Sequence, residues 1–177
     1  MTAANVKPIP ESYWVLPGEF LAGQYPLASL GNDAHNDQTL VAFLEAGFTV
    51  FIDLTRRGEL PPYLPALEKN AARYNVVIHH RRFDIADLGL PTREQMKAVL
   101  DAIDGALATG NKVYLHCWGG IGRTGMAVGC WLVRHGLKGE AALLRLNELY
   151  QTSGQSLVFP RTPETDAQTR FILEYQE

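Results

Sequence analysis

The sequence is poor in cysteine, carries little net charge and contains no long hydrophobic run. Its 177 residues include two cysteines, Cys117 and Cys130, too few for a disulfide scaffold of this size, so we expect a reducing, cytoplasmic compartment. No stretch approaches the roughly 20 apolar residues that cross a bilayer, and residues 1–18 hold no apolar core of signal-peptide length. The formal net charge of −3 argues against nucleic acid and anionic membranes as partners. Any anion must therefore be bound by a local cluster of donors.

The rest of the composition is that of one folded domain. Hydrophobic residues make up 46% of the chain and charged residues 20%, and 177 residues can bury a core without a metal or a disulfide. We expect one monomeric domain over residues 1–177, with residues 1–18 as a loose N-terminal segment. His79 and His80 have no partners at zinc-ligand spacing, so we expect neither a metal nor a cofactor.

Apolar patterning predicts strands that alternate with helices. Two short pieces, Tyr13-Trp14-Val15 and Phe20-Leu21-Ala22, are predicted as edge strands because proline and glycine interrupt them. Further strands are expected at 49–54, 76–83 and 112–116; helices are expected at 33–46, 62–74, 123–135, 138–152 and 163–175, and after Thr92, which has Gln95 at capping-box spacing. This alternation predicts an α/β fold: a central, mostly parallel twisted sheet with helices on both faces.

Such a fold fixes where a ligand binds. In open α/β sheets, ligands bind at the carboxyl ends of the strands, in the loops that lead to the next helix. Three loops of this kind stand out, at residues 55–61, 84–91 and 117–122. The first carries two arginines, the second two aspartates, and the third a cysteine among glycines.

The cysteine loop has the composition of an anion-binding nest. Cys117 ends a predicted strand, Arg123 follows six positions later, and Gly119, Gly120 and Gly122 fill most of the interval. Glycines let successive N–H groups turn inward, and the helix that follows adds its unpaired N–H groups and the positive end of its dipole. An arginine at that helix start can bind two oxygens of a tetrahedral anion. We expect Cys117, surrounded by these donors, to be a thiolate at neutral pH.

The segment His116-Cys117-x-x-Gly120-x-x-Arg123-Thr124 resembles the signature loop of the cysteine-dependent protein phosphatases, the tyrosine and dual-specificity group. The resemblance implies a protein tyrosine phosphatase-like fold and a compact, dual-specificity-like member. It implies that Cys117 forms a phosphocysteine and that Arg123 binds the phosphoryl oxygens. Thr124 would ease loss of the thiolate in the second step, and His116 would help to position the cysteine.

The second loop supplies candidates for a general acid. Attack by a thiolate leaves an alkoxide or phenoxide, which needs a proton from the opposite side of the phosphorus. The segment Asp87-Leu88-Gly89-Leu90-Pro91 resembles the mobile acid loop of the same family. Ile85-Ala86-Asp87-x-Gly89 is particularly similar to the version in phosphatases that associate with cyclin-dependent kinases. Asp87 is therefore the candidate acid and base, and Asp84 is expected to cap or brace the loop.

The resemblance extends more thinly to a third segment. Gln168 fits a position of the family segment whose glutamine places the hydrolytic water, although Glu164 stands where some members have another glutamine. An alternative interpretation is a helix-start cap built from Thr162, Pro163 and Glu164.

Other polar residues have weaker signals. Arg56 and Arg57 follow a strand where the family has a substrate-facing loop, so they are candidates to meet a second negative charge, and solvated surface arginines are the alternative. Cys130 lies in an apolar helix and is expected to pack in the core.

The leading prediction is hydrolysis of phosphomonoesters in two steps, on phosphotyrosine and also phosphoserine or phosphothreonine in proteins. Inositol phosphates are the main small-molecule alternative, although enzymes of this kind that act on polyphosphorylated rings often place lysine in the signature loop. The substrate-binding loop positions here are Trp118, Gly119, Gly120, Ile121 and Gly122. A phosphate-binding module without turnover, and arsenate reduction or sulfur transfer on a similar loop, are the alternatives from other classes.

Overall fold

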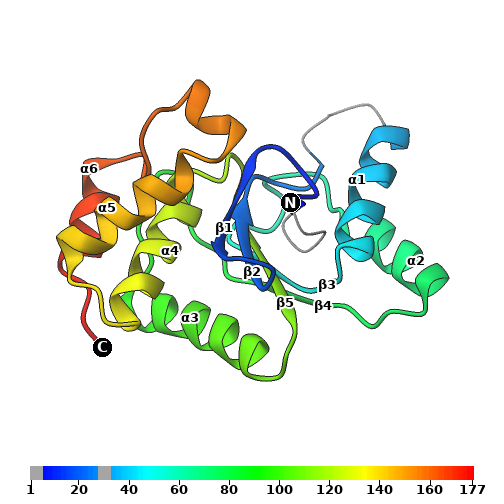
Figure 1. Cartoon of the computed structure of the whole chain (residues 1–177), viewed down its shortest axis with the longest axis horizontal. Coiled ribbons are helices and arrows are strands. Elements are labelled where there is room, and N and C mark those ends of the chain that lie inside the picture. The colour runs from blue at the N-terminus through cyan, green and yellow to red at the C-terminus, as the bar shows by residue number, and fades with distance from the viewer. Residues whose placement is uncertain (1–5, 28–32) are drawn as a thin grey trace.

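The computed structural model describes residues 6–27 and 33–177, and its centre is a five-stranded sheet (Figure 1). The strands are β1 (Ser12–Leu16), β2 (Phe20–Gly23), β3 (Phe48–Asp53), β4 (His79–Arg82) and β5 (Lys112–His116). Their order across the sheet is β1-β2-β5-β3-β4. Only β1 runs antiparallel to its neighbour, so the sheet is mostly parallel, as the sequence predicts.

The N-terminal strands differ from the prediction. β2 is not an edge strand, because it pairs in parallel with β5 as well as antiparallel with β1, and all four of its residues are buried. Pro17-Gly18 before it and Pro26 after it suggested an edge strand, but the chain reverses at Gly18 and brings β2 inside the sheet. Of the segment expected to be loose, Ser12–Leu16 forms β1, and residues 1–5 lie outside the described part of the chain.

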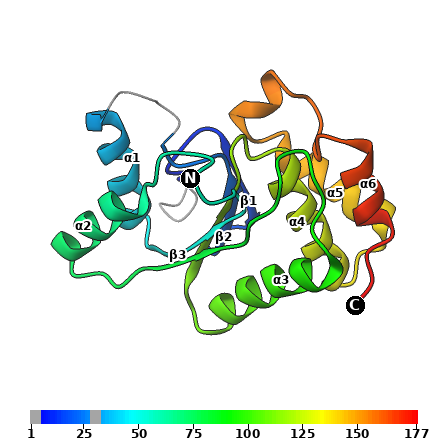
Figure 2. The same ribbon diagram turned by 180° about the vertical axis from the view of Figure 1, so that it is seen from behind.

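Helices cover both faces of the sheet (Figures 1 and 2). On one side lie α1 (Asp33–Glu45) and α2 (Leu64–Tyr74); on the other lie α3 (Arg93–Ala108), α4 (Gly122–Arg134), α5 (Gly139–Tyr150) and α6 (Asp166–Leu173). A 3-10 helix, η2 (Gly154–Leu157), follows α5. Each layer encloses its own apolar core, as expected for a sheet buried on both faces.

Two element boundaries move for local reasons. The strand expected at 76–83 is reduced to β4, because Asn75 adopts a left-handed conformation after α2 and the N–H of Val76 donates to the carbonyl of Ala71. The last helix begins at Asp166 rather than 163, because the side chain of Thr165 caps it by accepting from the N–H of Gln168.

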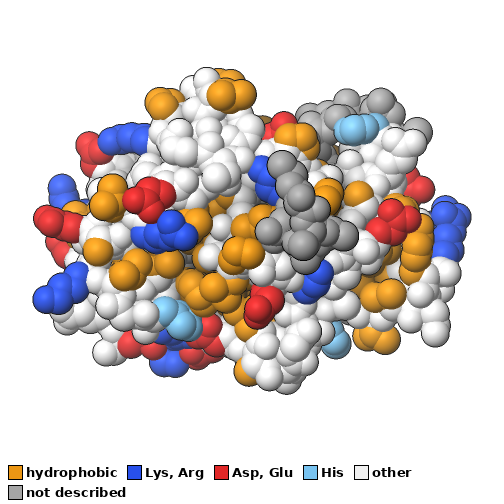
Figure 3. Space-filling model, in the orientation of Figure 1, with side chains coloured by type: hydrophobic (Ala, Val, Ile, Leu, Met, Phe, Trp, Pro, Cys, Tyr) orange, Lys and Arg blue, Asp and Glu red, His pale blue; other side chains and the backbone are white. Residues whose placement is uncertain are grey.

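The described surface mixes charges of both signs. On the face in Figure 3, acidic and basic side chains alternate without a large patch of one sign. Within residues 6–27 and 33–177, no helix is long and apolar enough to cross a membrane. The parallel strands all end at one edge of the sheet, where the loops after β2, β3, β4 and β5 meet.

Candidate active site

Cys117 follows β5 directly and opens the tight loop that leads to α4. The loop turns at Gly120, whose φ of +74° is strained for other residues, and a Cβ there would lie 2.4 Å from the carbonyl carbon of Gly23. The N–H of Tyr25 donates to the carbonyl of Trp118 at 2.8 Å. The segment after β2 therefore holds the loop in its curve, and only glycine fits at position 120.

Helix α4 brings its N-terminus to this loop. Ile121, at the N-cap position, contributes no side-chain cap, which leaves the N–H groups of the first turn available to an anion in the loop. The carbonyl of Ile121 accepts a hydrogen bond from the Thr162 hydroxyl at 2.7 Å, which fixes the start of the helix from outside. The positive end of the α4 dipole therefore lies beside Cys117.

Arg123 is buried, with 1% of its side chain exposed, and its guanidinium lies between two acidic residues. Nη1 and Nη2 donate to the carboxylate of Glu59 at 2.9 and 2.7 Å, and Nη2 lies 3.0 Å from Oδ1 of Asp87. Nη1 also donates to the carbonyl of Ile85 at 3.1 Å. Burial alone would lower the pKa of Arg123, but its hydrogen bonds to Glu59 and the nearby Cys117 raise it. The guanidinium therefore stays charged and is held facing the loops.

The contact of Glu59 with Arg123 was missed by the sequence analysis. It lies in the loop after β3, where Arg56 and Arg57 drew attention because they are cations near a phosphate site. The sequence did contain a signal for this contact: a carboxylate in a loop expected to lie at the same sheet edge as Arg123. Burial would raise the pKa of Glu59, and the hydrogen bond from Arg123 lowers it below its ordinary value.

His116, the last residue of β5, is fully buried. Burial lowers its pKa to about 4, so the ring is neutral at pH 7. Nδ1 lies 3.2 Å from the carbonyl of Cys117 and Nε2 lies 2.7 Å from the hydroxyl of Tyr63. A carbonyl only accepts, so Nδ1 carries the proton and Nε2 accepts from Tyr63. The backbone of Cys117 is thereby fixed by a histidine that Tyr63 orients in turn.

Asp53 braces the neighbouring strand ends. It is the last residue of β3, is buried, and accepts from the N–H and hydroxyl of Thr55 at 2.8 and 2.6 Å and from Nη2 of Arg82 at 2.6 Å. Burial alone would raise its pKa, but these hydrogen bonds help to hold the pKa below its ordinary value. Asp53 also lies 3.9 Å from Nδ1 of His116, so it helps to tie β3, β4 and β5 together under the site.

The acid loop carries Asp87 at a turn. The N–H of Gly89 donates to the carbonyl of Ala86 at 2.9 Å, and Leu88 adopts a left-handed φ of +56°. The Asp87 side chain remains 54% exposed although its carboxylate contacts Arg123. The structure thus brings Asp87 to the cysteine loop, as the sequence predicts, and leaves it open to solvent.

Asp84 has the bracing contacts expected of it. Its carboxylate accepts from the backbone N–H of Arg57 at 3.2 Å, and its own carbonyl accepts from Nε2 of Gln95 at 3.0 Å. These bonds connect the loop after β3 with the acid loop and with the start of α3. Asp84 therefore belongs to the framework of the two loops.

Gln168 is buried beside both the acid loop and the cysteine loop. Its Nε2 lies 3.4 Å from the carbonyl of Gly89, and a Cβ at Gly122 would lie 3.0 Å from its Oε1. Its Oε1 also accepts from the N–H of Thr165, completing a capping box. The cap is therefore made by Thr165 and Gln168, not by the residues 162–164 considered from the sequence.

Two further residues lie on α4. The hydroxyl oxygen of Thr124 is buried and has no hydrogen-bond partner among the described residues. Cys130 is a free, fully buried thiol within the apolar core, and burial raises its pKa. Cys130 is thus a packing residue of the core, as predicted, and Thr124 has an unused donor close to the loop.

Arg56 and Arg57 are exposed on the loop after β3. The described residues include no hydrogen bond or ion pair to either guanidinium. Arg57 lines a shallow hollow with Arg82, Asp84 and other residues of β4 and α3, and not with the cysteine loop. A contact of Arg56 and Arg57 with substrate therefore stays a prediction.

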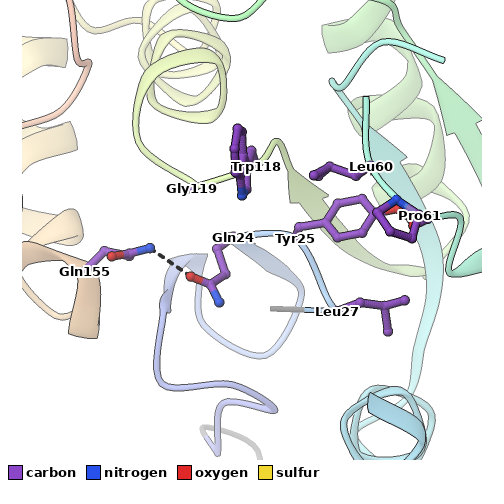
Figure 4. Close-up of a pocket in the computed structure, with 8 residues that line it drawn as sticks. All are labelled: Gln24, Tyr25, Leu27, Leu60, Pro61, Trp118, Gly119 and Gln155. Atoms are coloured by element: carbon purple, nitrogen blue, oxygen red, sulfur yellow. Dashed lines mark hydrogen bonds between the residues drawn. The ribbon is translucent and has the colours of Figure 1, made fainter. Parts of the chain in front are cut away.

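A second hollow, which we call the side pocket, adjoins the cysteine loop (Figure 4). It has a volume of about 140 Å³ and is lined by Gln24, Tyr25, Leu27, Leu60, Pro61, Trp118, Gly119 and Gln155. Trp118 and Gly119 follow Cys117 directly, while Gln155 lies in η2 and the other lining residues come from the loops after β2 and β3. Sequence reasoning named only these two of the eight. Within residues 6–27 and 33–177, no cluster of three acidic, histidine or cysteine residues could hold a metal ion.

Topology and loop chemistry together define the class of protein. Nucleotide-binding P-loops also place glycines between a strand and a helix, but there a lysine and a hydroxyl residue follow the glycines. Here a cysteine opens the loop and an arginine in the first turn of α4 closes it. The class is that of the cysteine-dependent phosphatase domains.

A family model described as "Polymorphic toxin system, DSP-PTPase phosphatase" matches residues 30–137, and the chain belongs to this family. Among curated proteins, the chain is similar to 067L of Invertebrate iridescent virus 3, which carries the provisional name tyrosine phosphatase. The two are 31% identical over 140 residues, 73% of this chain and 54% of the relative. Cyclin-dependent kinase inhibitor 3 of Sus scrofa is 32% identical over 85 residues, 48% of this chain and 39% of the relative. The chain thus spans about half the length, or less, of these relatives.

Solved structures of similar fold include phosphatases. The active form of Tk-PTP aligns with a TM-score of 0.69 and 25% identity, covering 93% of this chain and 95% of that one. Kinase associated phosphatase aligns with a TM-score of 0.68 and 18% identity, covering 88% and 84%. The human tyrosine phosphatase-like serine/threonine/tyrosine-interacting protein aligns with a TM-score of 0.66 and 20% identity, covering 94% and 96%. The predicted fold class and superfamily are therefore confirmed.

Proposed function

We propose that this chain hydrolyses phosphomonoesters of proteins, phosphotyrosine first and also phosphoserine or phosphothreonine, through a phosphocysteine intermediate. The observation that carries the proposal is the buried Arg123 guanidinium, which is 1% exposed, is held between Glu59 and Asp87, and lies close enough to Cys117 for the sulfur to raise its pKa. A cation buried at this point is suited to bind an anion, and Cys117 is the nucleophile next to it.

In the first step the Cys117 sulfur attacks phosphorus. The S–P bond forms as the bond to the leaving oxygen breaks, and protonated Asp87 gives that oxygen its proton. The loop amides, the N-terminus of α4 and Arg123 stabilise the charge on the three equatorial oxygens. Nε of Arg123 has no partner among the described residues, and its Nη2 donor faces Asp87, so these two groups are available to the phosphoryl oxygens.

In the second step water attacks the phosphocysteine. Ionised Asp87 accepts the water proton as the P–O bond forms, and the S–P bond breaks to return the thiolate. The free hydroxyl of Thr124 is suited to donate a hydrogen bond to the departing sulfur. Gln168, beside both loops, is suited to hold the water, and this role is compatible with its capping box because Nε2 points toward Gly89.

Two substitutions and one control test the proposal with a chromogenic phosphate ester. We expect Cys117→Ser to abolish turnover, and Asp87→Asn to lower kcat by about 10² to 10⁴ while substrate still binds. Asp84→Asn, the same change in the same loop, should lower kcat/KM by less than about fivefold. Turnover that requires a metal ion and persists in Cys117→Ser would contradict the proposal. Phosphate binding without turnover would support a non-catalytic module.

We also propose that residues 1–177 act as one monomeric phosphatase domain in a reducing, cytoplasmic compartment. Free Cys117 and Cys130 support the compartment, because a catalytic thiol must stay reduced. We expect peroxide to abolish activity and a thiol reductant to restore it; this measurement tests whether activity needs a reduced Cys117. An oxidised, disulfide-linked form of the protein that retains full activity would contradict the need for a reducing compartment.

A further inference from the structure

The side pocket shares a wall with the cysteine loop. Trp118 and Gly119, the two residues directly after Cys117, form one side, and Gln24, Tyr25 and Leu27, which follow β2, form another (Figure 4). A substrate whose phosphate sits over Cys117 must therefore pass next to this pocket. The pocket has no role in the two chemical steps described above.

We propose that the side pocket is a specificity subsite that receives one apolar side chain of a residue close to the phosphorylated residue in a protein substrate. This inference rests on the proposed function and names its substrate class. The pocket's volume of about 140 Å³ matches one side chain, since a cavity of about 150 Å³ lined by apolar residues accommodates benzene. Pockets for independent small molecules are larger, about 300 Å³ or more.

The lining excludes a second phosphate. None of its residues is charged: Leu27, Leu60 and Pro61 are apolar, and the hydroxyl of Tyr25 is already used, donating to the carbonyl of Pro61 at 2.7 Å. A phosphate or carboxylate there would lose hydration without a cation to replace it. An aliphatic or aromatic side chain has no charge to dehydrate, and it buries apolar surface against Leu60 and the exposed ring of Trp118.

Two amides at the rim suit a peptide backbone. Nε2 of Gln155 donates to Oε1 of Gln24 at 2.8 Å, which joins η2 to the segment after β2 (Figure 4). This leaves Nε2 of Gln24 as a donor and Oε1 of Gln155 as an acceptor, and neither atom has a partner among the described residues. A peptide group offers one acceptor and one donor, so an extended substrate backbone can satisfy both amides.

The surface beyond the rim is also apolar. Leu157, Val158 and Phe159, which follow Gln155, are 89%, 71% and 46% exposed. Exposed apolar side chains appear in Figure 3 over the upper edge of the molecule, where the η2 segment lies in Figure 1. A polypeptide substrate can bury such exposed apolar side chains, whereas a small hydrophilic phosphate ester cannot, which favours a polypeptide.

The first experiment scans the substrate. A parent phosphotyrosine peptide with serine at the three positions on either side is compared with variants that each carry a single leucine at one of these positions. We expect leucine at one position to raise kcat/KM about tenfold, as one apolar group in a fitted pocket does. Gains below twofold at every position would overturn the subsite.

The second experiment changes the pocket. In Leu27→Lys, kcat/KM for the best leucine peptide should fall to about the value for the serine peptide. A peptide with glutamate in place of that leucine should then be the better substrate. The matched control is Leu144→Lys on α5, where leucine is 67% exposed and outside the pocket, and there both values should stay unchanged. An unchanged ratio in Leu27→Lys would overturn the subsite while the phosphatase activity stands.

Failure of the proposed function has a different signature. If the unaltered protein turns over none of the peptides and no chromogenic ester, the function itself is wrong and the subsite falls with it. If a soluble inositol phosphate gives a higher kcat/KM than the best peptide, protein is the wrong substrate class although phosphatase activity remains.

Discussion

At the scale of single residues, the charge balance of the site is centred on Arg123. Glu59 binds two of its nitrogens from one side, and Asp87 contacts one of them from the other. A phosphoryl group arriving over Cys117 competes with the carboxylate of Asp87 for the same Nη2. In the proposed mechanism, substrate binding would therefore free Asp87 from Arg123 so that it can face the leaving oxygen.

We expect Glu59→Gln to lower kcat/KM by tenfold or more. Glutamine keeps the shape but removes the charge, so the buried guanidinium loses its orientation and part of its compensation. Steady-state kinetics on a chromogenic ester measures the loss. Glu68→Gln, on the exposed face of α2, is the matched control and should have wild-type kinetics. Equal kinetics in both variants would show that Glu59 does not position Arg123.

His116 gives the fold a dependence on pH. Burial holds the pKa of its ring at about 4, against 6.5 for an exposed histidine. Above pH 6.5 the ring is neutral in both states; between 6.5 and 4 only the unfolded chain takes up a proton. The stability is therefore lost as the pH falls through this window, by up to about 3 kcal/mol for this residue.

Urea unfolding at several pH values between 7.5 and 4.5 tests this for the wild type and His116→Gln. The variant is less stable near pH 7, because Tyr63 and the carbonyl of Cys117 lose their partner. The gap between the two free energies of unfolding should narrow as the pH falls. Parallel curves would mean that the histidine is protonated equally in the folded and unfolded states.

At the scale of elements, the cysteine loop owes its shape to the strand beside β5. Gly120 approaches the backbone of Gly23 so closely that β2 and the loop form one rigid unit, and Tyr25 adds a hydrogen bond to Trp118. The parallel pairing of β2 with β5 places these segments side by side. Preorganised amides stabilise a transition state better than amides that must first be arranged.

Two glycine substitutions distinguish the effect of backbone strain from the effect of a steric clash. Gly120 and Gly110 have similar φ values, +74° and +76°, but a Cβ at Gly110 meets nothing within 4 Å. Gly110→Ala should therefore cost about 1 kcal/mol of stability and leave activity intact. Gly120→Ala must displace Gly23 and should reduce kcat/KM at least 100-fold. Thermal unfolding and kinetics on both variants provide the comparison, and similar activities would contradict the close packing.

At the scale of the whole molecule, Arg134 ties α3, α4 and the C-terminal residue together. Its guanidinium lies 2.9 Å from carboxylate oxygens of both Asp101 and Asp104 and 2.5 Å from Oε1 of Glu177. This network lies on the layer of α3 to α6, at α4's far end from the cysteine loop. It supports the helix whose N-terminus carries the site.

We expect Arg134→Met to reduce the free energy of unfolding by about 1 kcal/mol at low ionic strength and by less in 1 M salt. The kinetics on small esters should not change, because the residue is at the other end of α4. Arg145→Met, which breaks an exposed pair with Glu148, should cost no more than about 0.5 kcal/mol. Denaturant titrations at two salt concentrations test both, and equal losses would argue against a network effect.

The local parts of the site could be predicted from the sequence. The spacing of His116, Cys117 and Arg123 predicted an anion-binding loop, and a resemblance to the family's acid loop predicted Asp87 as the acid, because each pattern lies within a few residues. The α/β alternation likewise predicted a mostly parallel sheet, and its buried strands were visible as short apolar runs. The edge strand β4, made of histidines and arginines, was predicted only as part of the longer stretch 76–83. The inner position of β2 could not be seen, because a short strand gives no signal for its neighbours.

What the sequence by itself determined is the chemistry of the loop: a thiol, glycines and a guanidinium at fixed spacing. Only the tertiary structure decided their partners, because pairs such as Arg123 with Glu59, 64 residues apart, depend on which loops meet at the sheet edge. Tyr63 behind His116 and the side pocket beside Trp118 have the same origin. Contacts between distant segments follow from strand order and packing, and no local spacing encodes them.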